Sequence, residues 1–165
     1  MNYEELLNMQ EQLDQHIMKK QKLQFIKLSS IALPLSVEIS EVANSYPVWK
    51  HWKSNKEPKP NLLEEVADVL SFLLQASNRF KVTAKMIQST RATKRNDIED
   101  QFLDLQYITF QIKNYGQAKD KQEYVKLFWS YFKGLWEHLG FSEKQIYEAY
   151  LKKNKINYER QATNY

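Results

Sequence analysis

The chain has 165 residues and a net charge of +4, and its 42% hydrophobic and 27% charged residues are ordinary proportions for a single globular domain spanning 1–165. It contains no cysteine, which excludes disulfides, thiolate metal sites and a cysteine nucleophile. No stretch approaches the ~20 apolar residues that span a membrane, and the acidic N-terminus does not resemble a signal peptide, so we expect a cytoplasmic protein without a membrane partner.

Helices are expected along most of the chain, because only three glycines and four prolines interrupt it. Ser29 offers a cap for the second helix, and Pro34 is expected to lie in its first turn or to kink it. Gly116 and Gly140 are typical stop signals. Apolar residues at helical spacing predict helices over residues 3–27, 29–52, 62–80, 97–114, 120–138 and 142–155.

The third predicted helix, 62–80, is apolar on nearly every face, which is typical of a helix at the centre of a bundle. Residues 81–96 are basic and polar, so we expect a mobile connection there, and we expect a flexible tail over 158–165. The sequence therefore predicts an all-α fold, a helical bundle of about six helices. A central pair of these helices carries the acidic motifs described next.

Two pairs of acidic residues interrupt apolar helices. Glu38 and Glu41 lie three residues apart on the second predicted helix, and Glu65 and Asp68 repeat this spacing on the third. Residues at this spacing share a helix face, and neither Glu38 nor Asp68 has a lysine or arginine three or four residues away. One such pair alone would be expected on a solvated surface. Two pairs in apolar surroundings favour a metal site, and oxygen-only ligands suit Mg²⁺ or Mn²⁺.

These motifs resemble those of a known superfamily. An ExxE motif at Glu38 and Glu41, followed after 23 intervening residues by ExxD at Glu65 and Asp68, is similar to the all-α nucleoside triphosphate pyrophosphatases, the MazG-like superfamily. Within it the chain looks most like the dimeric dUTPases. The resemblance implies that the four carboxylates hold two or more Mg²⁺ ions, with Mn²⁺ as a substitute. It also implies that Glu41 orients or deprotonates the attacking water.

Three further segments are similar to motifs of that family. Residues 6–14 resemble its N-terminal base-contacting segment, although Asp14 stands where the family often has asparagine. Residues 46–53 resemble its aromatic-Lys-x-Trp stretch, and residues 153–161 resemble its C-terminal phosphate motif. The resemblance implies base contacts from Gln10, Asp14, Trp49 and Trp52. It implies phosphate contacts from Lys153, Asn157, Arg160, Lys50 and Lys53.

Spacing alone supports part of this assignment. Lys153, Asn157 and Arg160 lie four and three residues apart, so one helix face would present them together to phosphate oxygens. A basic helix end that complements the helix dipole would need no ligand, and it is the alternative reading of the same residues. Trp49 and Trp52 would equally suit core or interface packing.

The expected activity is hydrolysis of dUTP to dUMP and pyrophosphate, with attack at the β-phosphate as the resemblance implies. The family also implies a homodimer, and no nucleic-acid partner is expected. A dCTP pyrophosphatase or a broad-specificity MazG-type enzyme would use the same acids with a different base pocket. From another class, a non-catalytic helical binding module would show no Mg²⁺-dependent turnover.

Overall fold

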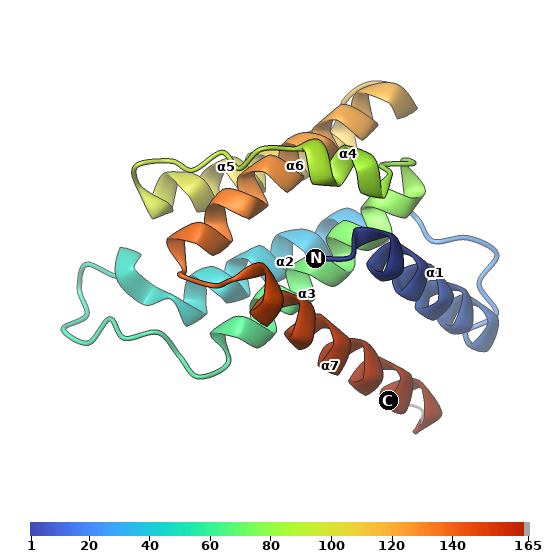
Figure 1. Ribbon diagram of the computed structural model, residues 1–165, viewed down its shortest axis with the longest axis horizontal. Coiled ribbons are helices and arrows are strands. Elements are labelled where there is room, and N and C mark those ends of the chain that lie inside the picture. Colours follow the sequence, from blue (N-terminus) through green and yellow to red (C-terminus); the bar gives the residue numbers. More distant parts are fainter. Residues whose placement is uncertain (164–165) are drawn as a thin grey trace.

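The computed structural model describes residues 1–163, so the last two residues of the predicted tail lie outside the described part. Every regular element in that part is helical, which confirms the predicted all-α class. Figure 1 shows the arrangement of these elements. In chain order they are α1 (Tyr3–Lys20), α2 (Ser29–Ser45), the 3₁₀ helix η1 (Pro47–Trp49), α3 (Leu62–Arg79), α4 (Ala84–Ser89), α5 (Ile98–Asn114), α6 (Ala118–His138) and α7 (Glu143–Ala162).

Three predicted helix ends were wrong. The first helix ends at Lys20 rather than at residue 27, and Lys22 then adopts a left-handed backbone with φ of 53°. The second ends at Ser45 rather than at residue 52, because Pro47 disfavours helical backbone in the residue before it. α7 continues to Ala162, so residues 158–162 are helical and not a tail.

The fourth difference is an additional helix, α4, inside the segment predicted as a connection. The Thr83 side chain caps its N-terminus by accepting a hydrogen bond from the Met86 N–H, and Ile87 is buried. Six residues are too few to give a periodic apolar pattern, so the sequence did not reveal this helix. The described part thus has seven α-helices where about six were predicted.

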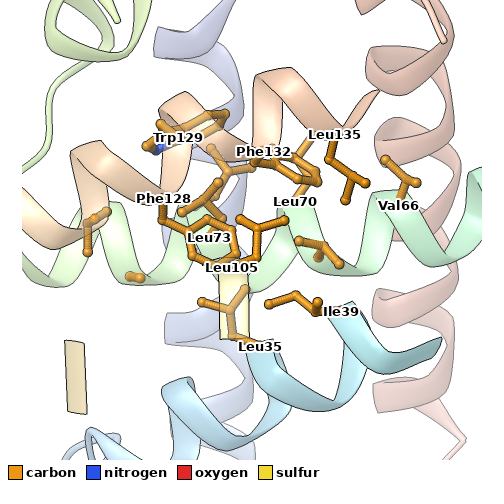
Figure 2. Packing of buried hydrophobic residues seen from close by; sticks show 14 of the residues in the cluster. Leu35, Ile39, Val66, Leu70, Leu73, Leu105, Phe128, Trp129, Phe132 and Leu135 are labelled. Carbon is orange, nitrogen blue, oxygen red and sulfur yellow. The ribbon is translucent and has the colours of Figure 1, made fainter. Parts of the chain in front are cut away.

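Helix α3 lies at the centre of the molecule, as its apolar faces predicted. It packs against α1, α2, α6 and α7, and Figure 1 shows it passing through the middle of the bundle. Figure 2 shows α3 side chains such as Leu70 and Leu73 between Leu35 of α2 and Phe132 of α6. None of the helices in residues 1–163 has the length and apolarity needed to cross a membrane. Because four other helices pack around α3, its acidic face is held on a rigid, buried support.

The segment before α5 crosses α6 at a glycine. The Thr93 N–H donates to the Ser130 carbonyl at 2.9 Å, and the Gln101 side chain donates to the Thr93 carbonyl at 2.9 Å. A Cβ atom added at Gly134 would overlap the Thr93 carbonyl oxygen and lie 2.9 Å from Gln101 Nε2. Gly134 is thus required by the close approach of two backbone segments.

Replacing Gly134 by alanine is expected to destabilise the protein by about 1–3 kcal/mol, through overpacking at this crossing. In an open helix position the same change would stabilise by about 1 kcal/mol, so the sign of the effect is diagnostic. Thermal unfolding of the variant, compared with alanine at the exposed Glu137 of the same helix, measures it. A raised midpoint for Gly134→Ala would contradict the close approach.

Candidate active site

The two acidic motifs meet where α2 packs against α3. Carboxylate oxygens of Glu38, Glu65 and Asp68 all lie within 4.8 Å of one another. The buried neighbours Ile39 and Val66 fix the two helices against each other, so these acids stand at the edge of the apolar core. Glu41 is exposed and lies one turn beyond Glu38. The structure therefore brings three of the four predicted ligands into one cluster and leaves Glu41 at its rim.

Proximity and burial make the charged state of this cluster costly. Burial, with smaller contributions from the charges of Asp68 and Glu65, raises the pKa of Glu38 to about 7. Burial likewise raises the pKa of Glu65 and of Asp68 above their ordinary values. The charge of Glu41 reaches the cluster too, because it adds to the raised pKa of Glu65. A cation is needed to keep all these groups ionised at neutral pH.

One such cation is Lys153 of α7. Its Nζ lies 2.6 Å from Asp68 Oδ2 and 3.0 Å from Glu64 Oε1, and its side chain is only 8% exposed. Burial by itself lowers the pKa of Lys153, but its bonds to the two carboxylates outweigh burial and raise it. Arg160, two turns further along α7, lowers the pKa of Asp68 through its charge. The half-buried Asn157 lies between these two basic residues on α7.

A hydrogen-bonded polar network lies beside the cluster. Gln10 Nε2 and Gln75 Nε2 both donate to Asp14 Oδ1, each at 2.8 Å, and the Tyr150 hydroxyl donates to Gln10 Oε1 at 3.1 Å. Burial raises the pKa of Asp14 to about 6, although the two amide bonds act to lower it. Gln75 lies seven residues after Asp68 on α3, so the network is ~10 Å from the acid cluster along the helix.

Residues 46–53 lie elsewhere. The Trp49 indole N–H donates to the Ala43 carbonyl at 2.8 Å, and Lys50 Nζ donates to Asn44 Oδ1 at 3.1 Å. The side chain of Trp52 is 63% exposed and meets Trp49 edge-on, and Lys53 is exposed. These contacts join the segment to the end of α2, and within residues 1–163 none of them links it to the polar network.

A protein-family model described as dUTPase matches residues 2–165, a range that includes the acidic cluster, the polar network and the basic face of α7. The chain belongs to the dUTPase family. This dUTPase is a hydrolase of acid anhydrides, and it acts on dUTP as a dUTP diphosphatase. A comparison with curated proteins gave no match. The predicted family is thus confirmed, while its placement within the MazG-like superfamily stays a prediction.

Enzymes of the dUTPase family depend in general on a divalent metal, and this chain has residues that fit one. The donor set consists of carboxylate oxygens without nitrogen or sulfur, as hard cations require. Burial, and to a smaller extent the charges of Asp68 and Glu65, raise the pKa of Glu38, and a bound cation would favour its ionised form. Lys153 already places a positive group against Asp68.

Sequence reasoning missed several residues of the acid cluster's surroundings and of the polar network. Glu64 was not among the predicted ligands, yet its carboxylate forms an ion pair with Lys153. Gln75 could have been found, because it is a polar residue in a largely apolar helix and it shares a face with Asp68. Tyr150 gave no local signal, because its contact with Gln10 joins residues 140 positions apart. Asn154 Nδ2 extends the network by donating to the Tyr150 hydroxyl at 3.4 Å.

Proposed function

We propose that this dUTPase uses Mg²⁺, two or more ions held by Glu38, Glu41, Glu65 and Asp68, to release pyrophosphate from dUTP and leave dUMP. The observation that carries the proposal is the convergence of three carboxylates within 4.8 Å of one another in a chain of this family. When bound at these carboxylates, Mg²⁺, or Mn²⁺ as its substitute, would neutralise phosphate charge and make a water molecule more acidic. The acidic helices α2 and α3 supply only oxygen donors for it.

Glu41 is proposed as the catalytic base. It shares a helix with Glu38 but lies outside the compact cluster, where its exposed carboxylate has access to water. A carboxylate that is not fully engaged as a ligand is free to orient or deprotonate the nucleophile. In this proposal the attacked atom is the β-phosphorus, so the products are dUMP and pyrophosphate.

Lys153, Asn157 and Arg160 are proposed to bind the phosphates. Lys153 faces the acid cluster and pairs with Asp68. When a metal ion replaces the lysine beside Asp68, the ammonium group would turn to a phosphate oxygen. Lys50 and Lys53 are proposed as further phosphate contacts. Lys50 would first have to leave Asn44, so a rearrangement of the segment after α2 is part of this proposal.

The polar network is proposed as the base pocket. Gln10 and Asp14 would meet the base, and Trp49 and Trp52 would wall it after the same rearrangement of the segment after α2. The buried Oε1 of Gln75 has no hydrogen-bond partner. A buried hydrogen-bond acceptor without a partner is costly, so a hydrogen-bond donor on the edge of the base would satisfy Gln75 Oε1.

The assembly and location of the enzyme are also proposed. A homodimer would cover part of its many exposed aromatic side chains. The whole chain is proposed to form one domain in the cytoplasm, with residues 81–96 as the connection about which one half of the bundle moves to close over the nucleotide. No nucleic acid is needed as a partner.

The function is tested by incubating the protein and Mg²⁺ separately with dUTP, dCTP, dTTP, dATP, dGTP and UTP and following pyrophosphate release. Fast release from dUTP alone is expected. Comparable release from dCTP or from several nucleotides would contradict uracil specificity and support a broader enzyme. Release from dUTP that is unaffected by EDTA would contradict the metal site.

Glu38 makes the metal-free protein sensitive to pH. Folding raises the pKa of Glu38 from 4.5 to about 7, so the folded protein binds this proton more tightly than the unfolded chain does. The contribution of Glu38 to the free energy of unfolding is therefore fully present below pH 4.5 and is lost as the pH rises through 7. Without metal we expect about 1–2 kcal/mol lower stability at pH 8 than at pH 5 from this group, after allowance for its partial exposure. Thermal unfolding in the presence of EDTA should show that Glu38→Gln removes this difference. If the pH dependence of stability is the same in the variant and the wild type, Glu38 is not its source.

Replacing Gln75 by leucine is expected to raise the KM for dUTP about tenfold, the equivalent of one lost hydrogen bond of about 1.4 kcal/mol, with little change in kcat. Gln111→Leu is a matched control, because Gln111 also has a buried Oε1 without a partner but lies on α5. Steady-state kinetics measure both variants. An equal rise of KM in the two would show that a general loss of stability, and not contact with the base, explains the effect.

A further inference from the structure

Exposed apolar side chains gather on one face of the bundle, which we name the α2/α5 face. It consists of Leu33 and Val37 on α2 and of Leu103, Tyr107 and Phe110 on α5, and each of these side chains is between 47% and 66% exposed. At spacings of four, four and three residues, they form a single stripe on each helix. The stripe on α5 extends over about 10 Å.

The two stripes form one continuous surface. Gln106 of α5 bridges to α2, because its Nε2 donates to the Ser36 carbonyl at 3.0 Å and to Ser40 Oγ at 2.9 Å. The Ser36 hydroxyl in turn donates to Gln106 Oε1 at 2.6 Å. Beside this bridge, a groove between the helices is lined by Leu33, Phe110 and their neighbours. The side-chain amide at the centre fixes the register of α2 on α5.

A continuous apolar surface of this kind is uncommon on a protein that stays monomeric. The opposite faces of the two helices are already used, since Leu35 and Ile39 of α2 and Leu105 of α5 are buried in the core. The α2/α5 face is therefore not a displaced part of the core. It is an additional apolar surface on two helices whose opposite faces pack in the core.

The charges at the ends of the α2/α5 face match each other. On α5, the exposed Glu99 lies seven residues before Gln106, and the exposed Lys113 lies seven residues after it. A two-fold axis that passes near Gln106 would set two α5 helices antiparallel. It would then place Glu99 of each copy opposite Lys113 of the other, with the apolar residues between them. Self-complementarity about a two-fold axis is what a homodimer interface requires.

We propose that the α2/α5 face is the two-fold interface with a second copy of this chain, with two α5 helices crossing antiparallel near Gln106. The proposal rests on the homodimer proposed above and names its surface. Val37 precedes the metal ligand Glu38 and lies one turn before Glu41. A second copy on this face would therefore lie close to Glu41, which shares a face of α2 with Val37.

Charge exchange tests this arrangement. Sedimentation velocity should give a mass of twice 19.8 kDa for the wild-type protein. Glu99→Lys and Lys113→Glu should each weaken dimerisation at least tenfold, because each brings like charges together, and the double exchange should restore it. Glu99 and Lys113 are exposed, so circular dichroism is expected to remain native in all three. Failure of the double exchange to restore the dimer would overturn the antiparallel register.

A second variant tests the apolar part of the face. Tyr107→Arg should give a folded monomer, whereas Leu127→Arg, at an exposed apolar position of α6 outside the face, should leave the dimer intact. A wild-type monomer would overturn both the face and the homodimer. A Tyr107→Arg protein that remains dimeric would overturn the face alone. Hydrolysis of dUTP by the same samples is read separately, so loss of the interface is distinguishable from failure of the metal chemistry.

Discussion

Replacing Glu41 by glutamine is expected to lower kcat for dUTP by about 10²–10⁴-fold, the range that a catalytic base contributes. The amide retains the size of the carboxylate but cannot take a proton. Since Glu41 is exposed and lies outside the cluster of Glu38, Glu65 and Asp68, the rest of the metal site should survive the change. We expect Mg²⁺ to stabilise this variant against thermal unfolding less than it stabilises the wild type but still measurably, because three of the four proposed ligands remain.

Asp68→Asn is the matched comparison, because it makes the same chemical change inside the cluster. Here both activity and stabilisation by Mg²⁺ should be lost, since a ligand itself is removed. Pyrophosphate release and thermal shifts with and without Mg²⁺ separate the two residues. If both variants lose stabilisation by Mg²⁺ to the same extent, Glu41 acts mainly as a metal ligand, and the argument for its role as the base is removed.

The second large effect is expected at Lys153, where binding of metal and turnover should change in opposite directions. Lys153→Met removes the cation that holds Asp68 and Glu64 in the metal-free protein. Mg²⁺ then has no internal competitor, so its affinity in the absence of nucleotide should rise. The kcat/KM for dUTP should fall about 100-fold, because a charged contact to phosphate worth about 3 kcal/mol is lost.

Removal of Lys153 also changes the metal-free stability. It leaves Asp68 without its ion-pair partner, and breaking a buried pair costs about 3–5 kcal/mol, less where the carboxyl can take up a proton. Calorimetric titration with Mg²⁺, together with steady-state kinetics, measures both effects. Lys155→Met is a suitable control, because Lys155 is exposed on the same helix and its carboxylate partner is Glu159. Weaker Mg²⁺ binding by Lys153→Met would contradict competition between the lysine and the metal.

Local patterns in the sequence predicted what depends on helix periodicity. The acid pairs could be placed on two apolar helices because three-residue spacing fixes a shared face, and α3 could be placed at the centre because it is apolar on nearly all sides. The start of α7 could be predicted too, and the structure adds a capping box between Ser142 and Gln145 there. Each of these features is encoded within about one or two turns of helix.

Features that depend on long-range packing could not be predicted in this way. The bond from Lys153 to Asp68 joins residues 85 positions apart. The local sequence around Gln10 and Asp14 gives no sign of burial, yet both side chains are buried against α3 and α7. Their environment is set by helices that approach from elsewhere in the chain.

The central position of α3 has a consequence for hydrogen exchange. Because four helices cover it, its backbone amides should exchange with deuterated solvent only when the whole molecule unfolds. α3 also carries Glu65 and Asp68, so a cation held there would be released on the same event. Protection by Mg²⁺ should therefore extend to the amides of every helix that unfolds together with α3, far beyond the residues that touch the ion.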